Sequence, residues 1–340
     1  MEQSLALLRQ IVPDMLDICV QRYELLRHIH AAQPIGRRVL AQKLNASERV
    51  VRSQVEVLRS LGLVDFTSLG ISLTAAGERI LPQLAGCFLC LKGMKEVRQE
   101  LLEKLPLSEV VIVPGNSDAD ETVQAELGRQ AAQLLAKRLE PGMTVAVSGG
   151  TTMEKTASQL VSRKVPISVV PARGGIGERV ECQANMIAAV IAEKTGGVYH
   201  MIHIPDGVTG ATLQALLDNE PHTLEVAHMA EHADIVLFGI GRSDIMAEKR
   251  QTSEGLRQEL ERRHSCGEAL GCYCDLNGHI VHTTNNVGLS VEKLKQIKTV
   301  IAVAGGASKA EAIIAVLRAA QTGILITDET AAAAMKRILG

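Results

Sequence analysis

The stretch "TVAVSGGTTMEK", Thr144 to Lys155, decides the fold class. It begins with an apolar, β-branched run, continues with two glycines and two threonines, and ends in a helical pattern. A strand that enters a helix through a glycine-rich turn is typical of α/β proteins, in which helices cover parallel strands. Glycines let backbone N–H groups approach an oxyanion, and the positive end of the next helix attracts it. The stretch therefore predicts an α/β sheet with an anion site at its edge.

The same alternation of strand and helix continues from about residue 107 to the end of the chain. Apolar runs such as "EVVIVPG", "ISVVPARGG", "DIVLFGIGRSD" and "TVIAVAGGASK" alternate with helical patterns at 122–139, 183–194 and 310–319. We predict a doubly wound, mostly parallel sheet over 107–340. One antiparallel exception is expected, a hairpin around Asn277 and Gly278, because Asn-Gly favours a two-residue turn.

Four of the predicted strands end in glycine-rich loops: "SGGTT", "PARGG", "GIGRSD" and "AGGASK". Ligands of open α/β sheets bind beyond the carboxyl ends of the strands, so these loops are expected at one edge. A single such loop commonly makes only a turn, but Thr151 and Thr152 add hydroxyls, and Arg173 and Lys309 add charge. The chain has neither GxGxxG with its acidic partner nor GxxxxGK[ST], which favours a small phosphorylated metabolite over a nucleotide.

The amino-terminal segment "PIGRRVLAQKLNASERVVRSQVEVLRSLGLV" predicts a helix-turn-helix. A first helix is expected to open at Pro34, with Val39, Leu40 and Leu44 on its apolar face. Ser47 is expected to cap a second helix over about 48–61. The inward-facing residues of that helix are predicted to be Val51, Val55 and Leu58, with Gly62 just after its end.

Charge and the following residues support a DNA-binding role for this segment. It carries six cations and two anions between Pro34 and Ser60, although the whole chain has a net charge of −2. The run "LVDFTSLGISLTAAG" predicts the two strands of a wing. A small helical bundle with a solvated basic face is the alternative. The expected DNA-binding residues are Arg37, Arg38, Ser47, Arg49, Arg52 and Ser53.

A third helical pattern runs from Leu84 to Leu105 and ends before Pro106. We predict a connecting helix, so that the domains are 1–86 (winged helix-turn-helix), 87–106 (linker helix) and 107–340 (effector-binding). Its apolar stripe is expected to pack either on a neighbouring subunit or in the core of one chain. Downstream, Asp118, Asp120 and Glu121 are expected in the first turn of a helix.

Composition sets further limits on the class of protein. The chain has 340 residues, 2% aromatic residues and no Trp, which predicts two domains with aliphatic cores. The seven cysteines have irregular spacing, and the single CxxC pair, Cys87 and Cys90, has no second pair at zinc-site spacing. We expect reduced, mostly buried thiols, no metal and no cofactor. No apolar run approaches the ~20 residues of a membrane span, so a cytoplasmic protein without membrane partners is expected.

Together these motifs resemble the SorC/DeoR family of sugar-responsive bacterial repressors. The resemblance covers the whole chain and is carried by "SGGTTMEK", "VVPARGGIGE", "QANMIAA", "MAEKRQT", "HIVHTTNNVGL" and "IAVAGGASKAEAI". It implies an effector domain similar in fold to glucosamine-6-phosphate deaminase and ribose-5-phosphate isomerase. It also implies a homo-oligomeric repressor, dimer or tetramer, that binds operator DNA. One branch of the family, which these segments resemble more than the others, implies that the protein represses glycolytic genes and is released from DNA by fructose 1,6-bisphosphate.

The resemblance further implies a set of effector-binding residues. Lys249 departs from it, since arginine is expected there, and lysine keeps the charge but loses the bidentate fork. A solvated helix end is the alternative role for Lys249 and Arg250. The implied phosphate cradle is Gly149, Gly150, Thr151 and Thr152, and the implied remainder of the site is Arg173, Gln183, Lys249, Arg250, Glu268 and Lys309.

Charge and catalytic chemistry separate two possible functions. A sugar bisphosphate carries roughly −3 to −4 at pH 7, which suits the four cations Arg173, Lys249, Arg250 and Lys309 better than a monophosphate does. The alternative is a sugar-phosphate isomerase or deaminase fused to a DNA-binding domain. Catalysis would need a group that moves a proton, and Glu268 is the best candidate, without an obvious partner. We therefore predict a repressor and not an enzyme.

Overall fold

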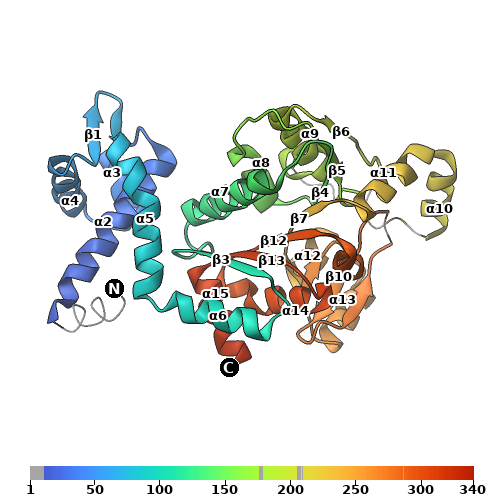
Figure 1. Cartoon of the computed structure of the whole chain (residues 1–340). Helices are drawn as coiled ribbons and strands as arrows, with labels where there is room; N and C mark the ends of the chain where they lie inside the picture. Colours follow the sequence, from blue (N-terminus) through green and yellow to red (C-terminus); the bar gives the residue numbers. More distant parts are fainter. Residues whose placement is uncertain (1–10, 176–178, 205–207, 209, 286) are drawn as a thin grey trace. The chain divides into compact units, whose positions relative to one another are not determined.

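The computed structural model describes residues 11–175, 179–204, 208, 210–285 and 287–340. It divides into two compact units, 1–95 and 96–340. Figure 1 shows the helical first unit in blue and the α/β second unit in green to red.

The first unit has the predicted winged helix-turn-helix. Its elements are α2 (Pro13–Ala32), α3 (Arg37–Lys43), α4 (Glu48–Ser60), β1 (Val64–Thr67), β2 (Gly70–Leu73) and α5 (Ala75–Leu91). The cap of α4 is confirmed, because Ser47 Oγ accepts a hydrogen bond from the Val50 amide at 3.3 Å. Val51, Val55 and Leu58 are buried, and Gly62 follows α4 with a φ of +70°, as predicted.

The start of the first helix was predicted wrongly. α3 begins at Arg37, because Ile35 pairs with Ile71 of the wing through two backbone hydrogen bonds of 3.0 and 2.9 Å. Extended backbone at Ile35 cannot also be helical, so Pro34 lies outside the helix. The inward position predicted for Val39 is also wrong, since Val39 is 48% exposed while Leu40 is buried.

The predicted connecting helix is two helices in the structure. α5 ends at Leu91 and α6 spans Met94–Lys104, with Gly93 between them at a φ of +68°. The apolar stripe packs in the core of each unit. The Phe88 ring lies 4.9 Å from that of Tyr23 in the first unit, while Leu101 and Leu105 are buried in the second.

The second unit is built on a seven-stranded, fully parallel sheet of strand order β3-β13-β12-β7-β4-β5-β6. The strands are β3 (Glu109–Val113), β4 (Thr144–Val147), β5 (Ser168–Pro171), β6 (Val198–Tyr199), β7 (Ile235–Gly239), β12 (Thr299–Val303) and β13 (Ile324–Asp328). The chain winds outward from β4 to β6, then returns to β7 on the other side of β4. The order therefore reverses between β4 and β7, where α/β proteins bind ligands.

Helices cover the sheet on both faces, as in Figure 1. An aliphatic core on one face joins the strands to α7 (Glu121–Arg138), α8 (Thr151–Gln159) and α9 (Ala184–Thr195). Elsewhere α11 (Pro221–Glu231) packs on β4 and β5, and α15 (Glu329–Leu339) on β13 and β3. The remaining helices are α10 (Gly210–Asn219), α12 (Ser243–Lys249), α13 (Glu254–Arg262) and α14 (Ala310–Ala320).

A second, four-stranded antiparallel sheet supplies part of the site. Its order is β11-β10-β9-β8, with β8 (Gly241–Arg242), β9 (Ser265–Ala269), β10 (Cys272–Asp275) and β11 (Ile280–Thr283). The predicted hairpin is confirmed as β10 and β11, and Gly278 has a φ of +86° in its turn.

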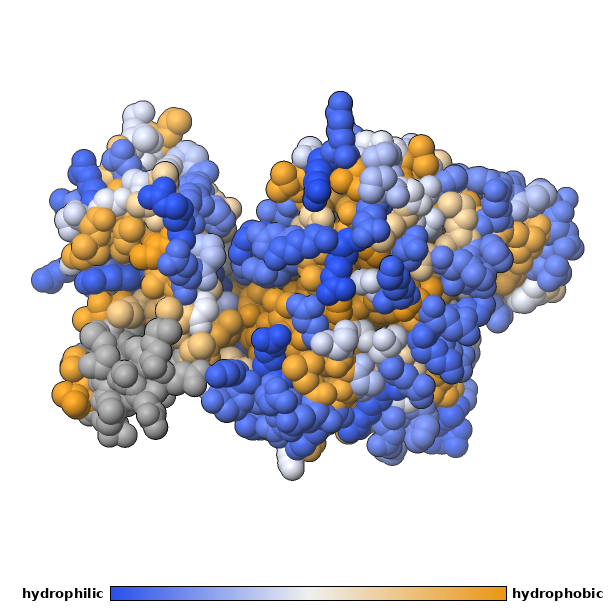
Figure 2. Space-filling model, viewed as in Figure 1, coloured by the Kyte–Doolittle hydropathy of each residue, from blue (hydrophilic) through white to orange (hydrophobic). Residues whose placement is uncertain are grey.

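Polar residues cover much of the surface of the second unit in Figure 2, with apolar residues in patches between them. Within the described part of the chain, no helix combines the length and apolar character needed to cross a membrane.

Candidate functional site

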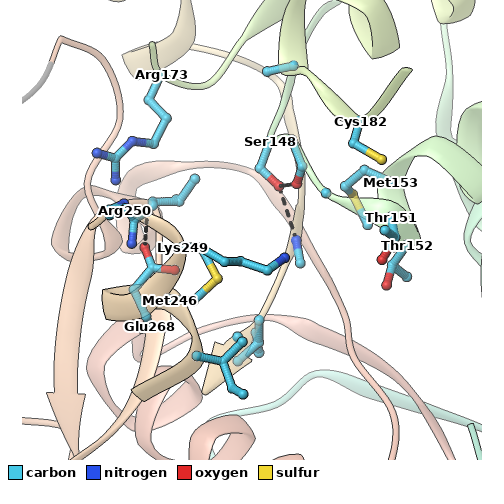
Figure 3. A pocket seen from close by; sticks show the side chains of 18 of the residues that line it. Ser148, Thr151, Thr152, Met153, Arg173, Cys182, Met246, Lys249, Arg250 and Glu268 are labelled. Carbon is cyan, nitrogen blue, oxygen red and sulfur yellow. Dashed lines mark hydrogen bonds and ion pairs between the residues drawn. The ribbon is translucent and has the colours of Figure 1, made fainter. Parts of the chain in front are cut away.

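A cavity of about 200 Å³ lies at the point where the strand order reverses. Its walls are the loops after β4, β5, β7 and β12, together with α12 and the antiparallel sheet. These are the four loops predicted to share one edge. In Figure 3, Thr151 and Thr152 lie on one side of the cavity and Arg173, Arg250 and Glu268 on the other. Lys249 extends between the two sides.

The threonine side is the amino-terminal end of α8. Thr151 and Thr152 are its first two residues, preceded by Gly150 with φ +120° and ψ +161°. That conformation is nearly restricted to glycine, so the sequence places glycine here for backbone reasons. The first amides of a helix have no intrahelical acceptor, and they carry the positive end of the helix dipole. This side of the cavity is therefore suited to an anion.

The opposite side contains a buried ion pair. Arg250 Nη2 lies 2.9 Å from Glu268 Oε1, and the two side chains are only 7% and 4% exposed. Glu268 Oε1 also accepts a hydrogen bond from the Gly271 amide at 2.7 Å, and Arg250 Nη1 donates to Tyr273 Oη at 3.1 Å. The burial rules out a solvated helix end for Arg250. Glu268 is held by its bonds to Arg250 and to the Gly271 amide, so its charge offsets one of the cations that line the cavity.

Arg173 reaches the same side from the loop after β5. It is buried, and its Nη2 donates to Thr284 Oγ1 at 2.7 Å. Gly271, with a φ of +76°, gives it room, since a Cβ there would overlap the guanidinium. Five cations line the cavity together with Glu268: Arg173, Arg242, Lys249, Arg250 and Lys309. Arg242 is paired with Asp244 at 2.6 Å, so counting the carboxylates of Glu268 and Asp244 leaves a net charge of +3.

Lys309 enters the cavity from the loop after β12. Burial lowers the pKa of its ammonium below the ordinary lysine value of 10.5, Lys249 lowers it further, and the carboxylates of Asp118 and Asp328 oppose the shift. The charged form of Lys309, which predominates below its lowered pKa, is the form that suits an anion.

All the effector residues predicted from the sequence line this one cavity. They are Gly149, Gly150, Thr151, Thr152, Arg173, Gln183, Lys249, Arg250, Glu268 and Lys309. They come from six separate segments of the chain, so the fold alone brings them together. Their roles in binding an effector remain predictions.

Sequence reasoning missed several lining residues. Ser148 Oγ accepts a hydrogen bond from the Gly239 amide at 3.1 Å and so ties the loop after β4 to the loop after β7. Met246 packs against Gly241, where a Cβ would lie 2.9 Å from its Sδ. One sequence signal could have identified these residues. Ser148 directly precedes the glycine pair after β4, and Gly241 belongs to the "GIGRSD" loop after β7, so both stand at the ends of predicted strands.

The glycine-rich loop after β12, "AGGASK" (304–309), was predicted to present backbone amides to an anion, but two of its amides are bound to the protein's own carboxylates. The Gly306 amide donates to Asp328 Oδ2 at 2.7 Å, and the Ser308 amide donates to Asp118 Oδ2 at 3.0 Å. Asp118 therefore caps this loop instead of joining the first turn of α7, where Asp120 is the cap and Glu121 the first residue. Lys309 is the group from this loop that lines the cavity.

The predicted DNA-binding residues lie on α3, α4 and the turn between them. Arg37, Arg38, Ser47, Arg49, Arg52 and Ser53 are all exposed. Arg38 forms an exposed ion pair with Glu48 at 3.3 Å, and the Ser47 hydroxyl caps α4.

Arg59 was not predicted and lies on the same basic surface. Its guanidinium is 4.8 Å from the centre of the Phe66 ring of the wing, and that of Arg37 is 5.8 Å away. The wing phenylalanine therefore orders two arginines from different helices.

The cysteines are free thiols, but fewer are buried than predicted. Cys182, Cys272 and Cys274 are buried, whereas Cys19, Cys87 and Cys90 are exposed. Burial raises the pKa of the Cys272 and Cys274 thiols, in keeping with packing roles. Among the residues that the structure describes, no cluster of His, Cys, Asp and Glu could hold a metal ion.

Comparison with known proteins identifies both units. Residues 91–336 match the family described as "Putative sugar-binding domain", and residues 18–88 match "CggR N-terminal DNA binding domain". The crystal structure of a "putative SorC family transcriptional regulator" from Enterococcus faecalis is 36% identical, with a TM-score of 0.65 over 71% of this chain and 99% of that one. The chain belongs to the SorC family of sugar-binding transcriptional regulators.

Relatives of this SorC-family regulator match it over nearly its whole length. A protein named "Central glycolytic genes regulator" from Priestia megaterium is 39% identical over 97% of both chains. Its namesake from Bacillus subtilis is 36% identical over 99% of both. The full-length sorbitol operon regulator SorC from Klebsiella pneumoniae, at 20% identity, shares the fold with a TM-score of 0.66 over 96% of this chain.

Proposed function

We propose that this SorC-family regulator is a cytoplasmic, homo-oligomeric repressor of glycolytic genes that a phosphorylated sugar releases from operator DNA. The gene class is supported by the two relatives at 36–39% identity, whose names state it. The effector class is supported by one observation: a cavity of net charge +3 faces the amino-terminal end of α8.

Among phosphorylated sugars, we favour fructose 1,6-bisphosphate. Its roughly −3 to −4 charge at pH 7 balances the cavity, whereas a monophosphate of −1.5 to −2 leaves positive charge unmatched. Two groups of residues on opposite sides of the cavity support two phosphates: the helix end at Thr151 and Thr152, and the cations Arg173 and Arg250. Glu268, which lies on the same side as these cations, suits a sugar hydroxyl next to the phosphate.

The observed contacts of Glu268 disfavour an enzyme. Glu268 is the one carboxylate among the described residues that line the cavity, and no histidine is found with it there. Its Oε1 is bound to Arg250 and to the Gly271 amide, so these contacts hold this oxygen away from a proton-transfer role. Incubation with sugar phosphates should therefore give no turnover.

A ligand screen followed by a release assay tests the proposal. A ligand that binds only the folded state raises its stability, so thermal shifts should single out one or few glycolytic intermediates. The selected effector should then weaken operator binding, and sedimentation with and without it should show whether the assembly changes. Lys309→Met should keep operator binding and lose roughly 10- to 100-fold in effector affinity, from one charge-assisted contact. Release that is unchanged in this variant would remove Lys309 from the site.

A further inference from the structure

Two carboxylates from other segments pack against the glycine-rich loop after β12, the loop that carries Lys309. A Cβ at Gly305 would lie 2.6 Å from Asp328 Oδ2, and a Cβ at Gly306 would overlap Asp118 Oδ1. The two glycines are therefore required by the close approach of the protein's own acidic side chains.

Asp328 anchors the loop from inside the unit. It is fully buried, and its Oδ2 accepts hydrogen bonds from the amides of Ser117 and Gly306 at 2.9 and 2.7 Å. Its Oδ1 accepts from the Ala331 amide at 2.8 Å and from Thr330 Oγ1 at 2.9 Å. One side chain thus joins the loops after β3 and β12 to the start of α15.

Asp118 holds the outer side of the same loop. Its Oδ2 accepts from the Ser308 amide at 3.0 Å and its Oδ1 from Ser308 Oγ at 2.8 Å, across 190 residues of sequence. Ser308 directly precedes Lys309, so these two bonds fix the backbone from which the lysine side chain departs.

We propose that Asp118 is a positioning residue of the effector site. Its carboxylate caps the glycine-rich loop after β12 and holds Lys309 as the group that this loop offers to a phosphate. The loop contributes a side-chain cation and not an amide cradle, because Asp328 and Asp118 take the Gly306 and Ser308 amides. The inference rests on the proposed function, since it assigns a role within that effector site.

The position of Asp118 has an electrostatic consequence for Lys309. Three charged groups act on the ammonium from different elements: Asp118 from the loop after β3, Asp328 from the end of β13, and Lys249 from α12. Burial lowers the pKa of Lys309, and Asp118 opposes that shift. Asp118 thereby keeps the lysine charged to higher pH in the absence of a ligand.

Asp118→Asn tests the inference in the full-length protein. The variant loses the charge and keeps one acceptor oxygen for the Ser308 amide, and its NH2 group can donate to the Ser308 hydroxyl, so the cap can persist. The position is exposed, where folding should persist. Glu121→Gln is the matched control, because it removes the same charge from an exposed residue three positions along. Ser308→Ala removes one bond and keeps the carboxylate, which separates the charge from the cap.

Two readouts are taken as a function of pH. Reductive ¹³C-methylation of the lysines and NMR report the titration of Lys309, whose resonance is assigned by its loss in Lys309→Arg. Calorimetry reports fructose 1,6-bisphosphate affinity. In Asp118→Asn, the Lys309 titration and the high-pH loss of affinity should both move to lower pH, with affinity in that range reduced roughly two- to fivefold. Glu121→Gln should match the wild type in both readouts. Ser308→Ala should show the same Lys309 titration as the wild type.

The possible failures are distinguishable. An unchanged Lys309 titration in Asp118→Asn, or an equal shift in Glu121→Gln, would overturn the inference while the wild type still binds the sugar bisphosphate. A wild type that binds no sugar phosphate would overturn the proposed function, and the Lys309 titration would still decide the contact with Asp118.

Discussion

Two of the four glycine-rich loops of the second unit, a first loop at 148–152 and a second loop at 304–309, look alike in sequence and differ in what they contact. At Gly150 a Cβ would meet nothing within 4 Å, and α8 begins beside an open cavity. At Gly305 and Gly306 a Cβ would run into Asp328 and Asp118. A pair of glycines after a strand therefore does not by itself distinguish a helix start beside an open cavity from a loop packed on the protein's own carboxylates.

The largest effect on stability should come from removing Asp328, the buried carboxylate at the end of β13 that binds the second loop. Asp328→Ala should lower the free energy of unfolding of the second unit by roughly 3 kcal/mol, because it leaves the buried amides of Ser117 and Gly306 without acceptors at about 1–3 kcal/mol each. Asp118→Ala, on the exposed side of the same loop, should cost less than about 1 kcal/mol. Urea unfolding followed by circular dichroism measures both. Equal losses would mean that burial does not distinguish the two carboxylates.

The glycines themselves should respond next most strongly, and differently. Gly150 and Gly306 have φ values of +120° and +95°, so alanine at either position costs backbone strain of about 1–3 kcal/mol. Gly306→Ala must also displace Asp118, and we expect it to lose about 1 kcal/mol more than Gly150→Ala. Adding Asp118→Ala should recover part of the loss in Gly306→Ala and none in Gly150→Ala. A double-mutant cycle with no coupling between positions 118 and 306 would contradict this account.

A smaller effect should separate the two loops in ligand binding. Thr151→Val keeps the shape of the side chain and removes its hydroxyl from the cavity side, so effector affinity should fall about fivefold, the value of one neutral hydrogen bond. Ser308→Val alters a side chain that contacts Asp118 and does not line the cavity, and it should leave affinity at neutral pH within about twofold. Calorimetry with fructose 1,6-bisphosphate compares them. The opposite ranking would place the phosphate at the second loop.

The sequence predicted the parallel sheet, the winged helix-turn-helix and the residues of the cavity, because each depends on a local pattern or on the family resemblance. The carboxyl ends of parallel strands lie at the same edge of a sheet whatever the strand order. Residues as distant in sequence as Gly149 and Lys309 could therefore be predicted to share one site. The cap of α4 at Ser47 was equally local.

What the sequence could not supply were contacts between distant segments. The bond from Asp118 to Ser308 spans 190 residues, and nothing near Asp118 distinguishes it from Asp120, which does cap the adjacent helix. The pairing of Ile35 with Ile71 likewise displaced the expected start of α3. Arg250 and Glu268, a buried ion pair in the structure, were predicted only as separate effector-binding residues. Charge alone does not show which groups neutralise each other.

The smallest predicted effect concerns pH and again separates the two loops. Backbone amides at α8 do not titrate, whereas Lys309 does, and burial places its pKa below the ordinary 10.5. The charged lysine is the form that suits phosphate, so affinity should be full below that lowered pKa and should fall a fewfold as pH rises through it. This loss is smaller than in Lys309→Met, because the neutral amine still donates a hydrogen bond and a bound phosphate favours the charged form. Lys309→Arg should remove this high-pH loss, because arginine stays charged above pH 12. Calorimetric titrations between pH 7 and pH 10 in both proteins check it. A high-pH loss that persists in Lys309→Arg would assign the titration to another group and leave the amide end of α8 as the main phosphate contact.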